Sequence, residues 1–262
     1  MKMGPKTRTG PYQILMMLRF SAWLLISIFG VATQGRAQQV MDVAYFEMVR
    51  VKPGNQEQFE TTLKRHWGWH EKMGEKWNYF VWSVDTGKNE GSYQIASFGH
   101  TWKEVDESNA LVAGTPGPGE DTEPYHQTAQ ESYYRYRPEL STASPVKPRL
   151  PVASVTQILL RPEAVHDFEV ALRQMATVKC PYVVSAQWYE LVTGGERPQF
   201  LLIEELPDWA SFRNKGELDA LGEEACRNVG EDIVKNFWSS IRSVHAETWH
   251  YRSDLSRLAG SK

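Results

Sequence analysis

Side chains of Val43–Val51 fall on two sides with a period of two, Ala44, Phe46 and Met48 on one side and Val43, Tyr45, Glu47 and Val49 on the other. A different spacing follows. After Pro53-Gly54, apolar residues return at intervals of four, at Phe59, Leu63 and Trp67. A period of two is typical of a strand, and a spacing of three to four is typical of an amphipathic helix. The pattern therefore predicts a strand, a turn and a helix. Both faces of the strand are largely apolar, so we expect both to be buried.

Two further strands, a second helix and a last strand are predicted next. Strands are expected at Tyr79–Asp85 and Tyr93–Gly99, with a glycine-containing hairpin turn between them. A helical region begins at Trp102, and the last strand is Ser132–Arg137. The order βαββαβ is that of a ferredoxin-like unit. Gly114–Pro124, which is rich in Gly and Pro, is expected to be an exposed loop.

The same pattern occurs a second time along the chain. Residues of the first copy have identical partners further on, in the same order and at nearly constant spacing, which indicates an internal repeat. The pairs at a spacing of 109 are Val43-Ala44 with Val152-Ala153, Pro53 with Pro162, Phe59-Glu60 with Phe168-Glu169, and Leu63 with Leu172. At the end of each copy, Tyr136-Arg137 and Leu140-Ser141 match Tyr251-Arg252 and Leu255-Ser256.

The second copy is expected to form the same elements as the first. The predicted ranges are strands at Val152–Leu160, Ser185–Val192, Phe200–Leu206 and Glu247–Arg252, a first helix carrying Phe168, Leu172 and Met175, and a long helical stretch over Ser211–Val244. In each copy, two helices cover one face of a sheet and leave the other face in need of a partner. We therefore predict an α+β fold in which two tandem ferredoxin-like halves pack sheet to sheet as an intramolecular dimeric α/β barrel.

Domain boundaries follow from the repeat and from changes in composition. Residues 1–37 combine basic residues, an apolar run at Phe20–Ala32 and a small-residue cleavage site at Gly35-Arg36-Ala37, which predicts a signal peptide. The alternative is an uncleaved anchor. The first repeat is then 38–140, a Pro-rich linker is 141–151, and the second repeat is 152–262. An exported protein, periplasmic or secreted, is expected. In that setting Cys180 and Cys226 either form a disulfide or stay as free thiols.

Charge narrows the range of partners. The net charge is −3, but residues 1–37 contain five basic residues and no acid, so the mature chain keeps 24 basic against 32 acidic residues. Nucleic-acid binding needs clustered Lys and Arg, so nucleic acid is not expected as a partner. After signal removal we expect no stable membrane span, and either a monomeric pseudo-dimer or a homodimer. A small-molecule ligand is the remaining partner.

Val49-Arg50-Val51-Lys52-Pro53-Gly54, followed by Phe59 and Leu63, resembles the strand-turn-helix opening of the dimeric α/β-barrel superfamily. This group includes antibiotic-biosynthesis-monooxygenase-like and NIPSNAP-like domains. The resemblance covers nearly all of 40–256. The resemblance implies the fold predicted above. For function it implies one of three classes: a cofactor-free monooxygenase, a haem-degrading or haem-dependent enzyme, or a member without known activity. No complete catalytic set of these enzymes can be carried over to the chain.

A pair of histidines stands out in the first repeat. His66 and His70 are four residues apart, so both imidazoles lie on one face of the predicted helix. They are interpreted as hydrogen-bonded structural residues, as a ligand or cofactor contact, or as part of a metal site. No third ligand is evident, so no metal is predicted. The second repeat has Met175 and Lys179 at these positions, which makes the histidines a feature of one half only.

Acidic residues inside strands are the other candidates. Glu47 lies in the first strand and Glu204 in the third strand of the second half. Alternation allows both to point into the space between the sheets, and the alternative is an edge or rim position where the carboxylate is solvated. A carboxylate buried there has a raised pKa and can act as a base. The predicted ligand-binding set is Tyr45, Glu47, His66, His70, Trp82 and Glu204.

Two functions are compatible with these features. The first is an exported protein that binds a small, partly apolar ligand between its sheets or serves in assembly. The alternative is a monooxygenase-like or haem-handling enzyme with its site in the first repeat. The sequence specifies neither a cofactor nor a reaction.

Overall fold

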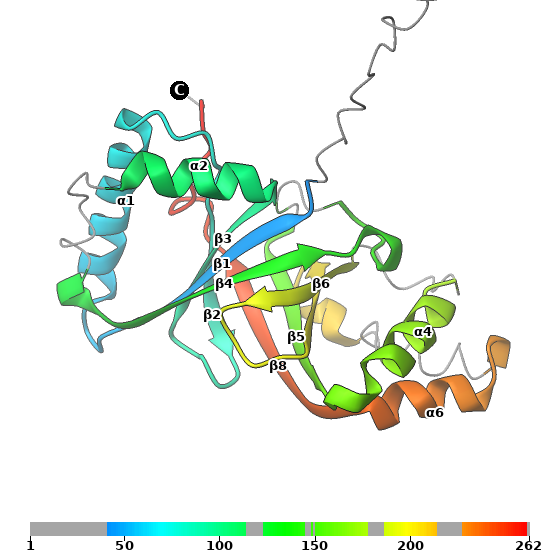
Figure 1. The fold of residues 1–262 in the computed structure, drawn as a ribbon. Helices are drawn as coiled ribbons and strands as arrows, with labels where there is room; N and C mark the ends of the chain where they lie inside the picture. Colours follow the sequence, from blue (N-terminus) through cyan, green and yellow to red (C-terminus); the bar gives the residue numbers. More distant parts are fainter. Residues whose placement is uncertain are drawn as a thin grey trace, which may run out of the picture. The chain divides into compact units, whose positions relative to one another are not determined.

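The computed structural model of the protein describes residues 41–113, 123–144, 148, 150–177, 186–213 and 227–260. The first half contains β1 (Val43–Val51), α1 (Gln56–Lys72), β2 (Phe80–Thr86), β3 (Tyr93–His100), α2 (Trp102–Val112), η1 (Glu123–Tyr125), β4 (His126–Tyr136) and η2 (Pro138–Leu140). The second half contains β5 (Val152–Leu160), η3 (Pro162–Ala164), α4 (Val165–Met175), β6 (Ala186–Thr193), β7 (Gln199–Leu206), η4 (Trp209–Arg213), α6 (Glu231–Ser240) and β8 (Ile241–Tyr251) (Figure 1). Among these helices none has the length and hydropathy needed to cross a membrane.

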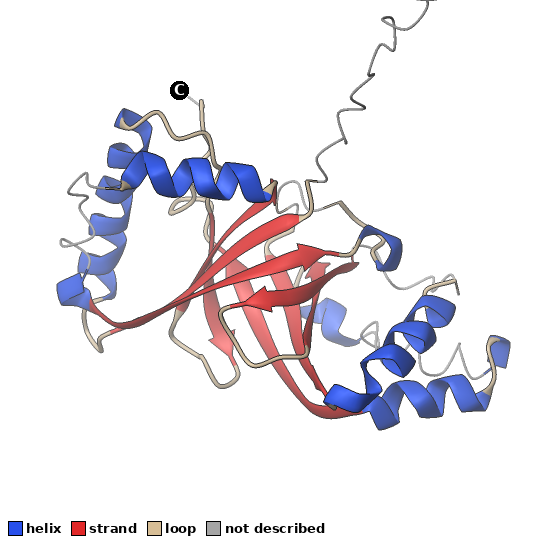
Figure 2. Cartoon of the chain, viewed as in Figure 1, coloured by secondary structure: helices blue, strands red, loops and turns tan. Residues whose placement is uncertain are grey.

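The strands form one closed barrel in the order β1-β3-β2-β8-β5-β7-β6-β4. Each half contributes four consecutive strands in the ferredoxin-like order, β4-β1-β3-β2 and β8-β5-β7-β6, and every pairing is antiparallel. The halves join where β2 pairs with β8 and β4 pairs with β6. The helices lie outside the barrel (Figure 2). This arrangement confirms the predicted fold class, and it adds that the two sheets meet along their edges as well as face to face.

Three hydrophobic clusters fill this architecture, one inside the barrel and one beneath the helices of each half. The barrel interior includes Phe46, Trp82, Tyr189 and Trp249. The other two clusters lie between sheet and helices, one in each half. β1 therefore buries both faces, as its composition predicts. Phe59, Leu63, Trp67 and His70 on α1 are buried, as are Phe168, Leu172 and Met175 on α4, which confirms the predicted helix stripes.

The helical stretch predicted over Ser211–Val244 is wrong at its C-terminal end. β8 begins at Ile241, because it pairs with β5 along its whole length, from Leu160 opposite Ile241 to Val152 opposite His250. β4 is likewise longer than predicted. Both strands are longer than the alternation of their side chains predicts, because they pair with β1 and β5, which are distant in sequence. The predicted signal peptide, most of the Gly/Pro-rich loop, part of the linker, Lys179, Cys180 and Cys226 lie outside the described residues.

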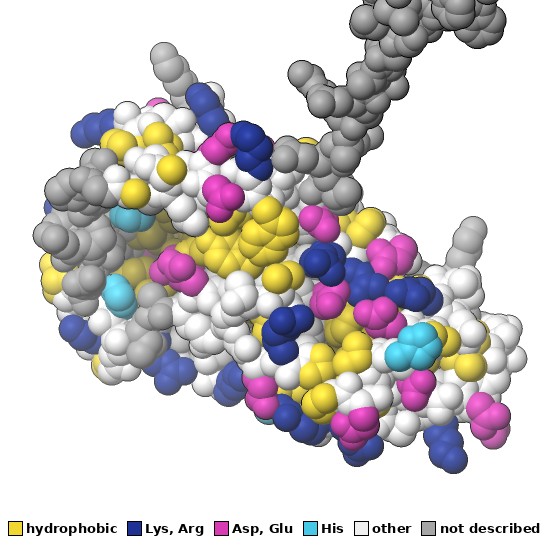
Figure 3. Space-filling view, viewed as in Figure 1, with side chains coloured by type: hydrophobic (Ala, Val, Ile, Leu, Met, Phe, Trp, Pro, Cys, Tyr) yellow, Lys and Arg dark blue, Asp and Glu magenta, His cyan; other side chains and the backbone are white. Residues whose placement is uncertain are grey.

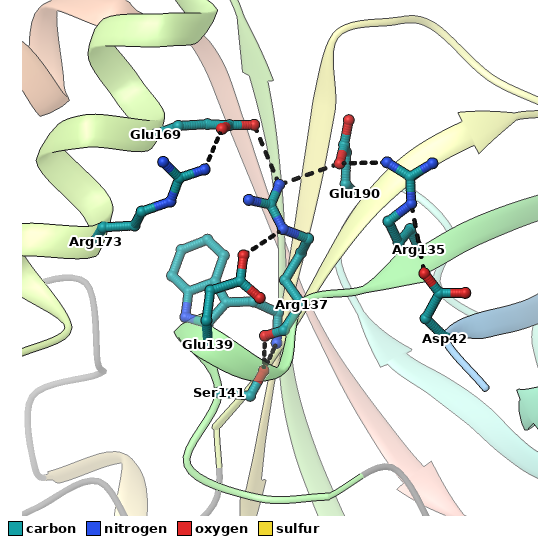
Figure 4. Close-up of polar contacts among 9 residues, drawn as sticks. Asp42, Arg135, Arg137, Glu139, Ser141, Glu169, Arg173 and Glu190 are labelled. Atoms are coloured by element: carbon teal, nitrogen blue, oxygen red, sulfur yellow. Dashed lines mark hydrogen bonds and ion pairs between the residues drawn. The ribbon is translucent and has the colours of Figure 1, made fainter. Parts of the chain in front are cut away.

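The end of each half binds the first helix of the other half through an arginine–glutamate ion pair, a contact here called a clasp. Arg252, just after β8, binds Glu60 of α1 through two hydrogen bonds of 2.7 and 3.0 Å. Arg137, just after β4, contacts Glu169 of α4 at 3.1 Å and also Glu139 and Glu190, as Figure 4 shows. Glu60 and Glu169 are equivalent in the repeat, so the two clasps are reciprocal. At both ends an arginine therefore reaches a carboxylate across the pseudo-dimer.

Two equivalent glycines allow the hairpin turns to approach the opposite half closely. Gly87 and Gly194 have φ of +96° and +90°, a conformation that residues with a side chain rarely adopt. A Cβ at Gly87 would lie 2.8 Å from the carbonyl oxygen of Ala246 in β8, and one at Gly194 would lie 2.2 Å from that of Glu131 in β4. The repeated glycines are therefore required by the joining of the two halves.

Candidate functional site

The helix-facing side of the first sheet carries a group of polar and aromatic side chains from neighbouring strands. Glu47 of β1 lies directly opposite Glu131 of β4, and Tyr45 lies opposite Tyr133 in the next helix-facing row. The Tyr45 hydroxyl donates a hydrogen bond to Glu47 Oε2 at 3.2 Å. Side chains two residues apart on a strand share a face, so these four groups form one surface, here called the first-half floor.

Burial raises the pKa of Glu47 to about 7, and the nearby charge of Glu131 acts in the same direction. The hydrogen bond from Tyr45 opposes this shift. The pKa of Tyr45 is raised well above its ordinary value, mainly by burial and then by Glu47. Near neutral pH, Glu47 is therefore populated in both its acidic and its basic form while Tyr45 stays protonated. Such a carboxyl group can accept a proton and return it.

Aromatic rings surround Tyr45, the hydrogen-bond partner of Glu47. Tyr45 lies 5.4 Å from Tyr133, 6.4 Å from Trp77 and 6.5 Å from Tyr79, measured between ring centroids. Trp102, at the start of α2, lies 5.8 Å from Tyr133 and is 43% exposed, and Glu131 is exposed as well. In the space-filling view, hydrophobic side chains gather in a hollow beneath α2, bordered by acidic and histidine side chains (Figure 3). The floor is thus open to solvent on one side.

Among the residues that the structure describes, the second half has no equivalent of this surface. Tyr45 and Glu47 correspond to Ser154 and Thr156. The space between sheet and helices is filled there by α4 and α6, where the Phe168 ring lies 5.0 Å from Phe237 and 5.1 Å from Phe200. The duplicated fold therefore carries this candidate site in its first half only.

A buried polar chain adjoins the floor. His66 Nε2 lies 2.8 Å from His70 Nε2, and His70 Nδ1 contacts the carboxylate of Glu75. Glu75 also accepts hydrogen bonds from Tyr79 at 2.9 Å and Ser108 at 2.7 Å. Burial alone would raise the pKa of Glu75, but the hydrogen bonds from His70 and Ser108 outweigh it and hold the pKa below its usual value. Tyr79 connects this chain to Tyr45 and the floor.

His66 is neutral at pH 7, because burial and the neighbouring His70 lower its pKa to about 4. Its Nδ1 atom is buried and has no hydrogen-bond partner among the described residues. His100 also has a pKa lowered to about 4, mainly by burial, and its ring stacks on Trp77 at 3.8 Å. Its Nε2 lies 2.6 Å from the Ser97 hydroxyl.

The structure brings together four of the six residues predicted from sequence. Tyr45, Glu47, His66 and His70 all lie in the first half on the side of the helices. Trp82 faces the barrel interior instead. Glu204 lies in β7, on the face opposite to that of Leu201 and Ile203, which point into the barrel.

Neither Glu47 nor Glu204 therefore points into the space between the sheets. Alternation gives the two faces of a strand but does not tell which face points inward, and the inner face of β1 carries Ala44, Phe46 and Met48 instead. Glu131, Tyr133, Trp77 and Glu75 were missed. For the first two, the signal is the alternation along β4, which places them on one face.

The first-half residues do not fit a haem. An axial histidine needs a free ring nitrogen, but both nitrogens of His70 are engaged, by His66 and by Glu75. The remaining nitrogen of His66 is buried in protein. In addition, the floor carries the carboxylates of Glu47 and Glu131, which would repel the propionate groups of a haem. Nor does any group of three or more His, Cys, Asp or Glu in the described parts of the chain have the arrangement of a metal site.

The barrel closure, the two βαββαβ halves and the surface between sheet and helices define an intramolecular dimeric α/β barrel. Solved structures share this fold. An anthrone oxidase-like protein is similar with a TM-score of 0.55 and 10% identity over 85% of this chain and 95% of that one. A candidate monooxygenase from Lactobacillus acidophilus NCFM has a TM-score of 0.53 and 7% identity, covering 85% and 98% of the two chains.

A chlorite dismutase variant from Candidatus Nitrospira defluvii is similar with a TM-score of 0.51 and 12% identity, covering 82% of this chain and 94% of that one. These matches confirm the predicted resemblance to the dimeric α/β-barrel superfamily as a match of structure. At such low identity they establish the fold alone. Comparison of the sequence with protein-family models and with curated proteins gives no match.

Proposed function

We propose that the protein is a monooxygenase-like enzyme that acts on a small aromatic substrate at the first-half floor, with Glu47 as its acid–base group. The observation that carries this proposal is the placement of a half-buried carboxyl group, with a pKa of about 7, next to the Tyr45 hydroxyl and among aromatic rings. A pKa near the working pH is the condition under which one group best takes and returns a proton.

The chemistry that suits this arrangement is oxidation of an activated CH₂ group. Glu47 takes a proton from the carbon, and the aromatic rings hold the planar anion that results. That anion is the electron donor to O₂, which is the co-substrate. Overall, CH₂ and O₂ give C=O and water, so the carbon loses four electrons and the two oxygen atoms gain them. Tyr45 hydrogen-bonds Glu47 and, because it stays protonated, can also donate to a substrate oxygen.

Anthrones are suitable probes, because their CH₂ group is acidified by the adjacent rings and because an anthrone oxidase-like protein shares the fold. We expect the protein to accelerate O₂ consumption with 1,8-dihydroxyanthrone above the spontaneous rate, with anthraquinone as product. Loss of a general base costs about 10²–10⁴-fold in rate. We therefore expect Glu47→Gln to lose at least about 100-fold of the enzymatic rate.

The matched control is Glu57→Gln, which removes an exposed carboxylate from the first turn of α1. This variant is expected to keep the wild-type rate. Equal rates for wild type and Glu47→Gln would contradict the assignment of Glu47. No acceleration by the wild type above the protein-free rate would contradict the oxidation of anthrone-type substrates.

A further inference from the structure

A cavity of about 290 Å³ lies inside the barrel at one end, on the opposite side of β1 from Glu47. Its apolar wall includes Phe46, Tyr134 and Trp249. Phe46 and Met48 flank Glu47 in sequence and therefore point to the other face of the strand. The cavity is thus separate from the first-half floor, with the thickness of the sheet between them.

Carboxamide side chains form the polar part of this cavity. The amide nitrogen of Gln94 donates to the main-chain oxygens of Glu47 and Ile95 at 3.0 and 2.9 Å. That of Gln130 donates to the main-chain oxygen of Gly194 at 3.0 Å. A main-chain oxygen can only accept, so the orientation of both carboxamides is fixed. Their carbonyl oxygens remain as acceptors at the cavity.

Two more carboxamides extend this surface. Gln199 donates to the Tyr134 hydroxyl at 2.7 Å, which again leaves a carbonyl oxygen. The side chain of Gln157, on β5, makes no hydrogen bond to another described residue, so both of its polar atoms can serve a ligand. These carboxamides therefore place several carbonyl acceptors beside a wall of aromatic rings, and Ser132, His245 and Lys88 line the same cavity.

Charged groups at this site are already paired or lie in solvent. Glu196, at the edge of the cavity, is ion-paired with Arg242, and Lys88 is exposed at the same edge, where water and salt screen its charge. The buried carboxylate of Glu247, next to the lining residues, accepts hydrogen bonds from Asn89 at 2.6 Å and from the Trp249 ring nitrogen at 3.0 Å. Neither arrangement favours a ligand with a net charge.

We propose that this cavity is a second ligand site, which takes an uncharged, single-ring molecule carrying several O–H donors, of the chemical class of sugars and cyclic polyols. The hydroxyl groups donate to the carboxamide oxygens, and the C–H face of the ring packs on the aromatic wall. The volume is at the lower end of the range of small-molecule sites, about 300–1,000 Å³, which fits one ring. The proposal does not depend on the activity of the first-half floor.

Saturation-transfer NMR followed by calorimetry on the purified protein tests this site. The neutral probes are glucose and myo-inositol, and the charged single-ring probes are benzylamine and benzoate. We expect saturable binding of at least one neutral probe. Gln157→Leu, which removes a carboxamide, and Ser132→Phe, which fills the cavity, should each weaken binding tenfold or more.

Gln58→Leu, on the exposed face of α1, and Glu47→Gln should bind the probe as the wild type does. Thermal melting within a few degrees of the wild type shows that each variant is folded. No saturable binding of either neutral probe would overturn the proposal. So would binding of charged probes alone, or wild-type affinity in both folded cavity variants.

Discussion

Individual buried polar residues in the first half are held by several partners each. Glu75 is 5% exposed, yet it contacts His70, Tyr79 and Ser108, and Arg257 donates to its main-chain oxygen. A buried carboxylate is stable only when its hydrogen-bonding capacity is used. The histidines of α1 are therefore part of the structure beside the floor, and His70 orients Glu75 while Glu75 fixes His70.

Replacing His70 with Ala tests this structural role. The change leaves Glu75 buried without its closest partner, and breaking such buried pairs costs about 3–5 kcal/mol. We expect a fall in the free energy of unfolding of this order, measured by urea denaturation at pH 7. His166→Ala, at an exposed position of α4, should change it by less than about 0.5 kcal/mol. Equal stability of the two variants would show that the His70–Glu75 contact is not structural.

At the scale of residues, sequence predicts the histidine pair and Glu47 but not their surroundings. The four-residue spacing of His66 and His70 is enough to place them on one helix face. Glu75, the partner of His70, lies in the turn after α1. Its contact with His70 depends on the path of that turn, which hydrophobic periodicity does not predict. The direction of Glu47 depends on which face of β1 closes the barrel, and this is decided by pairing with strands from both halves.

At the scale of elements, the two reciprocal clasps connect the two halves of the barrel, as the β2–β8 and β4–β6 strand pairings also do. Each clasp carries the same residues, Arg-x-x-Leu-Ser, at 137–141 and 252–256. Leu140 and Leu255 are buried beneath the helices, and Ser141 and Ser256 accept hydrogen bonds of 2.9 Å from the main chain of Trp188 and Val81. The repeat in sequence predicted these equivalent positions, but not which carboxylates the arginines contact. It could not predict where β8 begins, because its pairing with β5 is long-range.

The two clasps are expected to differ in strength. Arg137 is nearly buried and contacts three carboxylates, whereas the Arg252 side chain is 26% exposed. Arg137→Ala leaves more charge without a partner, so it should lower the free energy of unfolding by about 3–5 kcal/mol, against about 1–3 kcal/mol for Arg252→Ala. Arg242→Ala, which removes an exposed ion pair, should cost less than about 1 kcal/mol. Urea denaturation of the three variants checks the order, and a smaller effect at Arg137 than at Arg252 would contradict it.

At the scale of the whole folded unit, the two halves share one barrel but differ beneath their helices. The second half is filled by aromatic and aliphatic side chains, while the first half keeps polar groups over its sheet. This asymmetry is consistent with a functional surface in the first half, while the second half completes the barrel and supports it. The internal repeat predicted the duplication, but the hollow in the first half depends on how α1 and α2 pack over the floor.

The closed barrel predicts that the halves stay together when the connection between them is cut. Either half alone would expose the edges of β2 and β4, or of β6 and β8, and unpaired edges promote aggregation. A protease site inserted after Ser144 should give a nicked protein that elutes as one species in size-exclusion chromatography and separates only in denaturant. Two folded fragments eluting separately without denaturant would contradict the shared barrel.

Titration of Glu47 near neutrality on the first-half floor can be followed by carbon-13 NMR of the glutamate side-chain carboxyl groups. Protein labelled at glutamate is titrated from pH 4 to 9, and the Glu47 signal is assigned by its loss in Glu47→Gln. We expect an apparent pKa of about 7 for this signal. Because the folded pKa is above the unfolded value, the wild type should also lose stability relative to Glu47→Gln as pH rises from about 4.5 to 7. A Glu47 signal that titrates near 4.5 would show that Glu47 is an ordinary carboxylate and cannot serve as the acid–base group.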